Sequence, residues 1–210
     1  MAYGAWVEFL DRVKSEQALV SFPTDTVPAI AARPNASDRI YAAKQRPADK
    51  PLILMGADWG DLQPYLAGSE AELAQWQALA EAYWPGALTL VLPASDRVPP
   101  AMNPQQTGTL GIRVPDHTLA RHILRHTGPL ATTSANRSGQ PALTTRAAIA
   151  EAFPAVLQLS DAAISDLQSA IGPFTLTASG VPSTVAAWQA TGWRILRQGS
   201  VQLPADLLAS

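Results

Sequence analysis

The sequence predicts an α/β fold in a single domain, with helices flanking a twisted, largely internal sheet. The chain has 210 residues, of which 47% are hydrophobic and 15% charged, and this suits one sizeable globular core. Short apolar runs rich in β-branched residues alternate with helical patterns. Asp, Gly and Pro stand at nearly every junction between these segments, as expected of turns.

Seven apolar runs predict the strands, and four further segments with the N-terminus predict the helices. The strands are expected at 18–22, 51–55, 88–92, 110–114, 129–133, 183–188 and 193–197. The helices are expected at 37–45, 69–84, 117–127 and 145–153, with Ser37 as the cap of the first. Residues 1–16 predict an amphipathic helix with Trp6, Val7, Leu10 and Val13 on one side. The stretches 93–109 and 163–182 predict long irregular loops.

Composition excludes several classes of function. Cysteine is absent, which removes disulfides, thiolate catalysis and cysteine zinc sites and fits a reducing cytoplasm. No apolar run approaches the roughly 20 residues of a membrane span, and the N-terminus does not resemble a secretory signal, so no membrane partner is expected. A net charge of −2 argues against a whole surface that grips nucleic acid. A local basic pocket remains compatible with these features.

Familiar catalytic motifs are missing. The chain has no Gly-rich phosphate loop, no dinucleotide fingerprint and no nucleophile-elbow serine. His122 and His126 have the i, i+4 spacing of metal ligands, but no glutamate accompanies them and Arg121 and Arg125 flank them. We therefore expect surface histidines and no metal site in the protein itself.

Basic residues are concentrated before one apolar run, in "KQRPADKPLILM" at 44–55. Two of the three lysines of the chain, Lys44 and Lys50, lie here with Arg46 between them. The segment is either a solvated turn or part of a pocket for a polyanion.

Two other polar features interrupt apolar segments. Thr24, Asp25 and Thr26 follow the first predicted strand, as a capped turn or as ligand-binding groups at the end of the sheet. Arg113 stands within an apolar strand, where a charge must be paired. Its partner is either a structural carboxylate or the carboxylate of a ligand, since the guanidinium fork fits both.

A run of small hydrogen-bonding side chains, "LATTSANRSGQPALTT" at 130–145, follows another predicted strand. It includes Thr132, Thr133, Ser134, Asn136 and Ser138. Such groups can orient a substrate without adding net charge, so the run predicts part of a ligand site.

Seven segments in series resemble the YrdC-like family of threonylcarbamoyl-adenylate synthases. They are "PTDTVPAI" (23–30), "KQRPADKPL" (44–52), "WPGALT" (84–89), "TLGIRVP" (109–115), "SANRSG" (134–139), "STV" (183–185) and "ILRQG" (195–199). No single segment is decisive, but seven in the family's order over about residues 20–199 are specific.

The resemblance implies both fold and activity. The expected fold is an open, twisted mixed sheet with flanking helices around a concave basic cavity, as one YrdC-like domain over residues 1–210 without the C-terminal domain of longer relatives. The expected enzyme is a nucleotidyltransferase that makes threonylcarbamoyl-adenylate and pyrophosphate from L-threonine, bicarbonate or CO₂, and ATP. Mg²⁺ accompanies the ATP, and a tRNA-modifying transferase complex uses the product.

By resemblance, the basic segment faces the triphosphate and the arginine of the "GIRV" strand holds threonine. Lys44 and Arg46 are the expected catalytic residues. The expected ATP-binding residues are Lys44, Arg46, Lys50, Thr109, Asn136, Thr144 and Arg197. The expected threonine-binding residues are Thr26, Arg113, Ser134 and Ser183.

Departures from the family pattern fall mainly on the threonine side. Asp25 replaces a glutamate, Pro28 and Ala29 replace Tyr-Gly, and Met55 stands where many members have histidine. They leave open one alternative, a diverged paralogue acting on another amine. A further alternative is an RNA-binding or ribosome-assembly module with weak RNA binding that uses the same basic cavity, which the low net charge disfavours.

Overall fold

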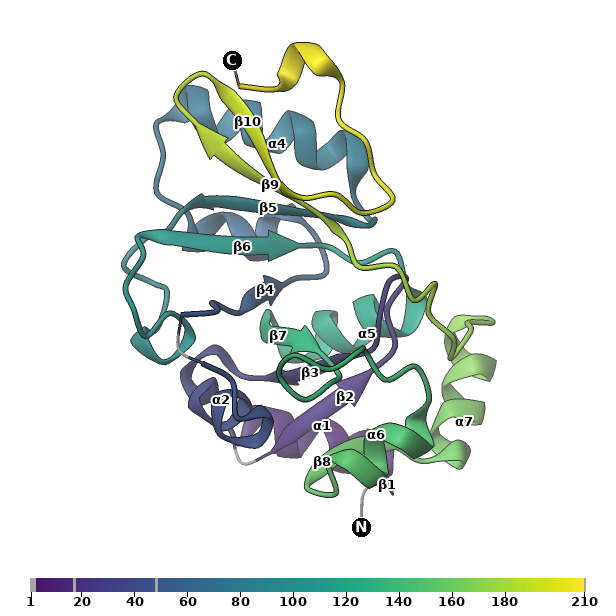
Figure 1. The fold of residues 1–210 in the computed structure, drawn as a ribbon. Coiled ribbons are helices and arrows are strands. Elements are labelled where there is room, and N and C mark those ends of the chain that lie inside the picture. The colour runs from purple at the N-terminus through teal and green to yellow at the C-terminus, as the bar shows by residue number, and fades with distance from the viewer. Residues whose placement is uncertain (1–2, 17, 48, 210) are drawn as a thin grey trace.

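The structure is a computed structural model that describes residues 3–16, 18–47 and 49–209. Its described strands form a sheet in the order β1-β8-β2-β3-β7-β4-β6-β5-β9-β10 (Figure 1). The strands are β1 (Tyr3–Gly4), β2 (Leu19–Phe22), β3 (Ala29–Ala32), β4 (Ile53–Met55), β5 (Leu88–Pro93), β6 (Thr109–Arg113), β7 (Leu130–Ser134), β8 (Val156–Leu159), β9 (Thr184–Gln189) and β10 (Gly192–Arg197). Both parallel and antiparallel pairs occur along this order, so the sheet is mixed, as predicted.

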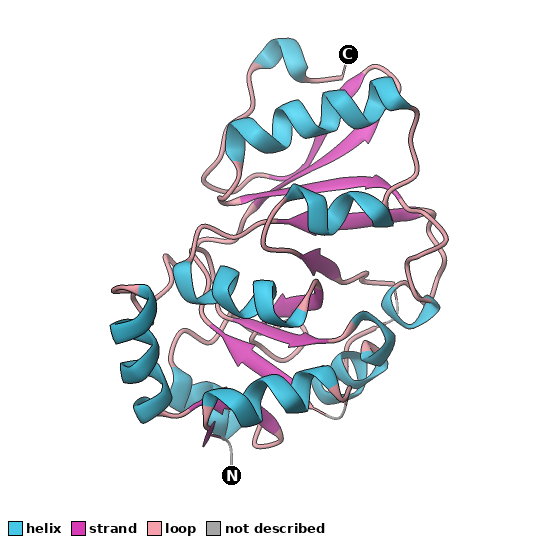
Figure 2. Cartoon of the chain, turned by 180° about the vertical axis from the view of Figure 1, so that it is seen from behind, coloured by secondary structure: helices cyan, strands magenta, loops and turns pink. Residues whose placement is uncertain are grey.

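Helices lie against this sheet, and Figure 2 shows several of them over the face that is turned back in Figure 1. They are α1 (Trp6–Lys14), α2 (Asp38–Lys44), α3 (Trp59–Leu62), α4 (Glu70–Tyr83), α5 (Thr118–Thr127), α6 (Arg146–Ala152) and α7 (Asp161–Ile171). Short 3₁₀ turns are η1 (Pro34–Ala36), η2 (Gln63–Tyr65), η3 (Pro100–Met102) and η4 (Ala205–Leu207). None of the described helices is long and apolar enough to span a membrane.

The central strands are buried on both faces. Along β3, Ile30 and Ala32 belong to one hydrophobic cluster, whereas Ala29 and Ala31 belong to another. Because successive strand residues point to opposite faces, the two clusters form apolar layers on the two sides of the sheet. Strand β7 lies between β3 and β4, with Ser134 opposite Ala29. The polar residues that end β7 therefore lie at the middle of the sheet.

The seven predicted strands and the four predicted internal helices are present within one or two residues, whereas the N-terminal helix α1 begins only at Trp6. Several elements were not predicted. Strands β1, β3 and β8 and helices α3 and α7 lacked a sequence prediction. Strand β3 is the run "AIAA", which shows no polar alternation because both its faces are buried. Helix α7, capped by Ser160, occupies the first half of the stretch predicted to be irregular at 163–182.

Two local predictions were wrong. In α1 the buried residues are Phe9, Leu10 and Val13, whereas Val7 is 67% exposed, so the apolar face is rotated from the one expected. Ser37 does not cap α2, because its backbone is already helical and its hydroxyl donates to the carbonyl of Pro34.

Candidate active site

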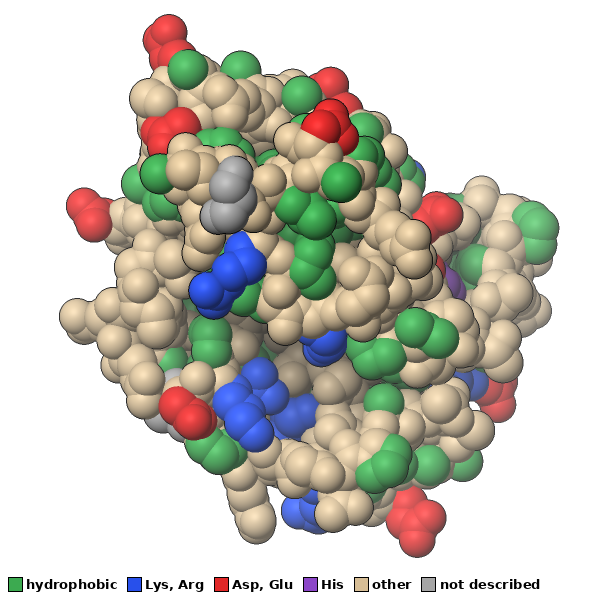
Figure 3. Space-filling model, turned by 45° about the horizontal axis from the view of Figure 1, so that its top comes forward, with side chains coloured by type: hydrophobic (Ala, Val, Ile, Leu, Met, Phe, Trp, Pro, Cys, Tyr) green, Lys and Arg blue, Asp and Glu red, His purple; other side chains and the backbone are tan. Residues whose placement is uncertain are grey.

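A cavity of about 410 Å³ opens over the middle of the sheet, within the size range of small-molecule sites. Figure 3 shows Lys and Arg side chains gathered around a hollow in the centre of the view. Five elements or their adjoining loops supply its polar lining: the β2–β3 loop, α2, β6, β7 and the β9–β10 hairpin. These lining residues are Thr26, Arg46, Arg113, Thr132, Thr133, Ser134, Asn136, Gln140, Ser183 and Arg197.

Arg113, at the end of β6, is a buried cation in the wall of this cavity. Its Nη2 donates to Asp25 Oδ1 at 2.6 Å, its Nη1 to Thr26 Oγ1 at 2.7 Å and its Nε to the Gly86 carbonyl at 3.0 Å. Burial lowers the pKa of Arg113, and the Asp25 carboxylate opposes that shift. The structural partner that the sequence left as one alternative is thus present. Three of the five guanidinium N–H bonds have these partners, which leaves two for a ligand carboxylate.

The Asp25–Thr26 turn connects Arg113 to the long segment after α7. Thr24 Oγ1 lies 3.2 Å from Thr26 Oγ1 and donates to the Val27 carbonyl at 2.7 Å, which fixes the turn. The Gly180 N–H donates to the Thr26 carbonyl at 2.8 Å. This contact holds the chain that leads to Ser183 beside the cavity.

The end of β7 and the loop after it supply the hydroxyl and amide groups predicted from the sequence. Ser134 Oγ donates to Asn136 Oδ1 at 2.6 Å, and Asn136 Nδ2 donates to the Gln140 carbonyl. The loop is therefore folded on itself by its own side chains. Its polar groups face the cavity without bringing a carboxylate into the lining.

Lys44 lies beneath this loop and is only 1% exposed. Its Nζ donates to the Ser134 carbonyl and to Asn136 Oδ1, the latter at 3.1 Å. Burial, helped by the nearby charge of Arg46, lowers the pKa of Lys44 to about 7. An amine in this position is only partly charged at neutral pH, and a phosphate nearby would favour the charged form.

Arg46 follows α2 and lines the cavity. Its Nε donates to the Lys50 carbonyl at 2.9 Å and its Nη2 to the Pro51 carbonyl at 3.1 Å. Burial lowers its pKa as well, against the opposing effects of Tyr41 and Asp49. The carbonyls of Lys50 and Pro51 thus orient the Arg46 side chain, which lines the cavity.

The β9–β10 hairpin brings Ser183 and Arg197 together. Arg197 Nε and Nη2 donate to the Ser183 carbonyl at 3.0 and 2.9 Å, and Ser183 Oγ lies 2.8 Å from Thr89 Oγ1. A pairing irregularity between Ile195 and Arg197 turns the strand at this point. A Cβ on Gly199 would lie 2.3 Å from the Pro182 carbonyl oxygen, so only glycine fits here.

Four predicted site residues lie outside the cavity lining. They are Lys44, Lys50, Thr109 and Thr144. Lys44 reaches the cavity through Ser134 and Asn136, and Lys50 is exposed with its carbonyl bonded to Arg46. Thr109 Oγ1 lies 3.2 Å from Thr107 Oγ1.

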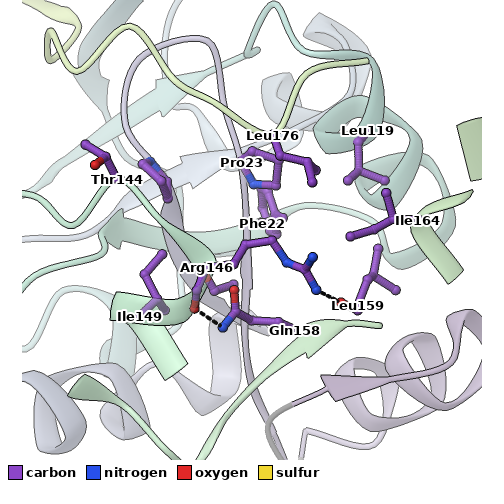
Figure 4. A pocket seen from close by; sticks show the side chains of 12 residues that line it. Phe22, Pro23, Leu119, Thr144, Arg146, Ile149, Gln158, Leu159, Ile164 and Leu176 are labelled. Carbon is purple, nitrogen blue, oxygen red and sulfur yellow. Dashed lines mark hydrogen bonds between the residues drawn. The ribbon is translucent and has the colours of Figure 1, made fainter. Parts of the chain in front are cut away.

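Thr144 borders a different and much smaller space. This pocket of about 20 Å³ is lined mainly by apolar side chains such as Phe22, Leu119 and Ile164, with Arg146 and Gln158 at one side (Figure 4). Arg146 donates to the Leu159 carbonyl there. The space is far too small for a nucleotide.

Several lining residues were not predicted as site residues. Pro51, Ile53, Gln140, Pro141, Ala142 and Pro182 belong to this group. All lie inside or within three residues of the recognised segments, so proximity in sequence was the available signal.

Within the described ranges, no three His, Asp or Glu side chains group as a metal site.

His122 and His126 of α5 pack against Trp6 of α1, outside the cavity. The ring of Trp6 lies 5.1 Å from that of His122 and 5.4 Å from that of His126. Partial burial, with His126 and Arg125 nearby, lowers the pKa of His122. The pair thus forms an aromatic contact between α1 and α5.

Comparison with known proteins agrees with this architecture. The Sua5/YciO/YrdC family model, described as "Telomere recombination", matches residues 13–199. A protein named threonylcarbamoyl-AMP synthase from Chromohalobacter salexigens is 38% identical over 151 residues, covering 70% of this chain and 80% of that protein. Its namesake from Bacillus subtilis is 43% identical over 136 residues, covering 61% of this chain but only 38% of the relative.

Solved structures give the same result. P. abyssi Sua5 complexed with L-threonine superposes with a TM-score of 0.77 at 31% identity, over 91% of this chain and 53% of that one. E. coli YciO shares the fold with a TM-score of 0.74 at 20% identity, over 96% and 91%. The resemblance predicted from the seven segments is confirmed, and the chain belongs to the Sua5/YciO/YrdC family.

Proposed function

We propose that the protein is a threonylcarbamoyl-AMP synthase, which makes threonylcarbamoyl-adenylate and pyrophosphate from L-threonine, bicarbonate or CO₂, and ATP. One observation carries the proposal: a single cavity is lined by Arg46, Arg113 and Arg197 and by neutral hydroxyl and amide groups. Such a lining suits substrates that bring a carboxylate and a triphosphate into one space.

The proposed reaction needs alignment more than a protein nucleophile. The threonine amine adds to CO₂ and loses a proton, giving a carbamate. A carbamate oxygen then attacks the α-phosphorus of ATP. The bond between this phosphorus and the oxygen that bridges to the β-phosphate breaks, and pyrophosphate leaves with that oxygen. Charge accumulates on phosphate oxygens in this step, and fixed guanidinium groups stabilise it.

For the threonine end, we assign the carboxylate to the two remaining N–H bonds of Arg113. The Asp25 contact keeps the guanidinium oriented while the ligand binds. Thr26 and Ser183, both buried in the cavity wall, and Ser134 would contact the rest of the amino acid.

For the nucleotide end, Arg46 is the side chain best placed to contact phosphate, with Asn136 and Arg197 also in the lining. The ammonium of Lys44 donates to Ser134 and Asn136. Lys44 would act as a catalytic cation if the same ammonium also donates to a phosphate oxygen. Lys50, Thr109 and Thr144 remain predicted ATP ligands that would have to reach in from outside the lining.

Mg²⁺ fits this site as a companion of ATP. The cavity lining has no carboxylate among its described residues, and hydroxyl and amide oxygens alone make a weak cage for a hard cation. The ion would therefore be held mainly by the phosphates, where it would neutralise charge on the leaving pyrophosphate.

The product would be used by a tRNA-modifying transferase complex. We therefore expect the enzyme in the cytoplasm.

A second candidate, a paralogue acting on another amine, is favoured by one feature. Met55 and Ala29 line the cavity with apolar surface at positions where the family pattern has other residues.

Pyrophosphate release tests the proposal. Purified protein with ATP, Mg²⁺ and bicarbonate should release pyrophosphate only when L-threonine is added, and removal of bicarbonate should abolish the release. Serine, valine and a series of other amines serve as matched controls. Release with a different amine alone would identify the second candidate, and ATP- and amine-independent RNA binding without turnover would reject both.

A further inference from the structure

A second, larger groove lies at the other end of the β9–β10 hairpin. It has a volume of about 970 Å³ and is bounded by α4, the hairpin turn and η4. Trp188 and Trp193 form an aromatic part of its wall, with ring centroids 5.2 Å apart in an edge-to-face arrangement. Leu79, Tyr83 and Leu207 add further apolar surface.

Small side chains form one stripe of the helix beside this groove. Ala71, Ala74, Ala78 and Ala82 of α4 are exposed, and Glu70, Gln75 and Glu81 are exposed polar residues on the same helix. The groove and this alanine stripe, called here the α4 surface, therefore combine small side chains that allow close approach with acidic groups beside them.

Charge identifies the kind of partner that fits the α4 surface. Two acids, Glu72 and Asp206, line the groove, and no Lys, Arg or His is among its described lining residues. Glu70 and Glu81 are exposed on α4 beside it. Such a surface repels the phosphates of RNA and also repels a second copy of itself, because both would bring like charges together.

We propose that the α4 surface docks a cationic, partly apolar segment of a partner protein. Apolar side chains of the segment pack against the partly exposed Trp188 and the alanine stripe of α4, and a Lys or Arg can also stack on the indole of Trp188. Its remaining basic side chains pair with Glu72 and Asp206.

The position of this surface relative to the cavity suits a partner that receives the product. Trp188 and Trp193 flank the turn of the β9–β10 hairpin, whereas Ser183 and Arg197 stand at its open end. In Figure 1 the hairpin spans from α4 toward the middle of the sheet. A segment docked at α4 would hold its protein near the cavity without covering it.

A designed peptide tests the proposal. The probe is a synthetic helix of Lys, Ala and Leu of about 18 residues, compared with a matched peptide in which every Lys is Glu. We expect the basic peptide alone to change tryptophan fluorescence, to bind less tightly as salt is added, and to protect residues 70–83 from hydrogen exchange.

Three variants separate specific docking from general attraction. Ala78→Arg and Asp206→Lys should each weaken peptide binding about tenfold and leave pyrophosphate release unchanged. Glu151→Lys, on α6, makes the same charge change as Asp206→Lys at a distant exposed site and should bind normally. Equal weakening by Glu151→Lys, or equal binding of both peptides, would overturn the proposal. A dimer in solution that Ala78→Arg dissociates would also overturn it, because a second copy would then cover the surface.

Discussion

Arg113 and Lys44 are both buried cations at the candidate site, but their surroundings differ. Arg113 has a carboxylate partner, Asp25, at 2.6 Å, whereas Lys44 donates to a backbone carbonyl and a side-chain amide. The paired guanidinium stays charged and oriented. The pKa of Lys44 is lowered to about 7, so at neutral pH about half of the lysine is uncharged. The difference suggests that one end of the site is preformed, whereas the other gains charge when a phosphate arrives.

Replacing Arg113 by Met should have the largest effect, because it leaves the half-buried carboxylate of Asp25 without its cation. Removal of one partner of a fully buried pair costs about 3–5 kcal/mol of unfolding free energy, and the partial exposure of Asp25 should lower this cost. Threonine-dependent pyrophosphate release should be lost as well. Urea denaturation measures the first effect and the release assay the second.

The double variant Asp25→Asn/Arg113→Met is the control for this prediction. It removes both charges, so it should recover most of the lost stability without recovering activity. If the double variant is as unstable as the single one, the Asp25 contact is not what holds Arg113 in place.

Arg46→Ala should lower kcat/KM for ATP by about 10²–10³-fold, the usual cost of removing one charge-stabilising donor. The fold should be unaffected, since Arg46 is only partly buried. Arg125→Ala is the matched control, because it removes the same charge from an exposed position on α5, outside the lining. Equal losses in the two variants would mean that net charge, and not the placement of Arg46, supports ATP use.

The proton of Lys44 offers a more selective test. At pH 8.5 a lysine of pKa about 7 is mostly neutral, and a bound triphosphate should raise that pKa. ATP binding should therefore take up about one proton. Calorimetry in two buffers of different ionisation enthalpy measures this uptake, and Lys44→Met should abolish it. The same uptake in Lys44→Met would assign the proton to another group.

The sequence predicted local secondary structure better than contacts between residues far apart in the chain. Strands such as β5 and β7 and the polar run after β7 were predicted because each is recognised from the residue types within a few positions. Strand β3 was missed because burial on both faces removes the alternation. The burial of Lys44 under Ser134 and Asn136 joins residues about 90 positions apart, which local pattern does not encode.

The candidate site shows the same division. The ordered segments identified Arg46, Arg113, Asn136 and Arg197, and the structure brings all four to one cavity. They did not separate these residues from Lys50, Thr109 and Thr144, which lie outside the lining. Membership in a segment fixes position along the chain, whereas the direction of a side chain depends on packing against other elements.

His117 extends the comparison to a third buried group and should give the smallest effect. Its Nδ1 accepts from the Ala120 N–H at 3.3 Å and so caps α5, which leaves the proton on Nε2, 3.0 Å from the Thr175 carbonyl. Burial lowers the pKa of His117, although the Thr175 contact and the charges of Asp25 and Asp116 oppose the shift. In mildly acidic solution His117 therefore binds a proton more readily in the unfolded chain than in the folded chain. Stability should therefore fall slightly as pH drops below the ordinary histidine pKa of about 6.5.

His117→Asn tests this because an asparagine oxygen can still cap the helix but does not titrate. The variant should show a weaker fall in melting temperature between neutral and mildly acidic pH. His122→Gln is the control, since the pKa of His122 is also lowered and contributes its own share. If only His122→Gln flattens the pH dependence, the acid-sensitive group is His122 and not the neutral His117 cap of α5.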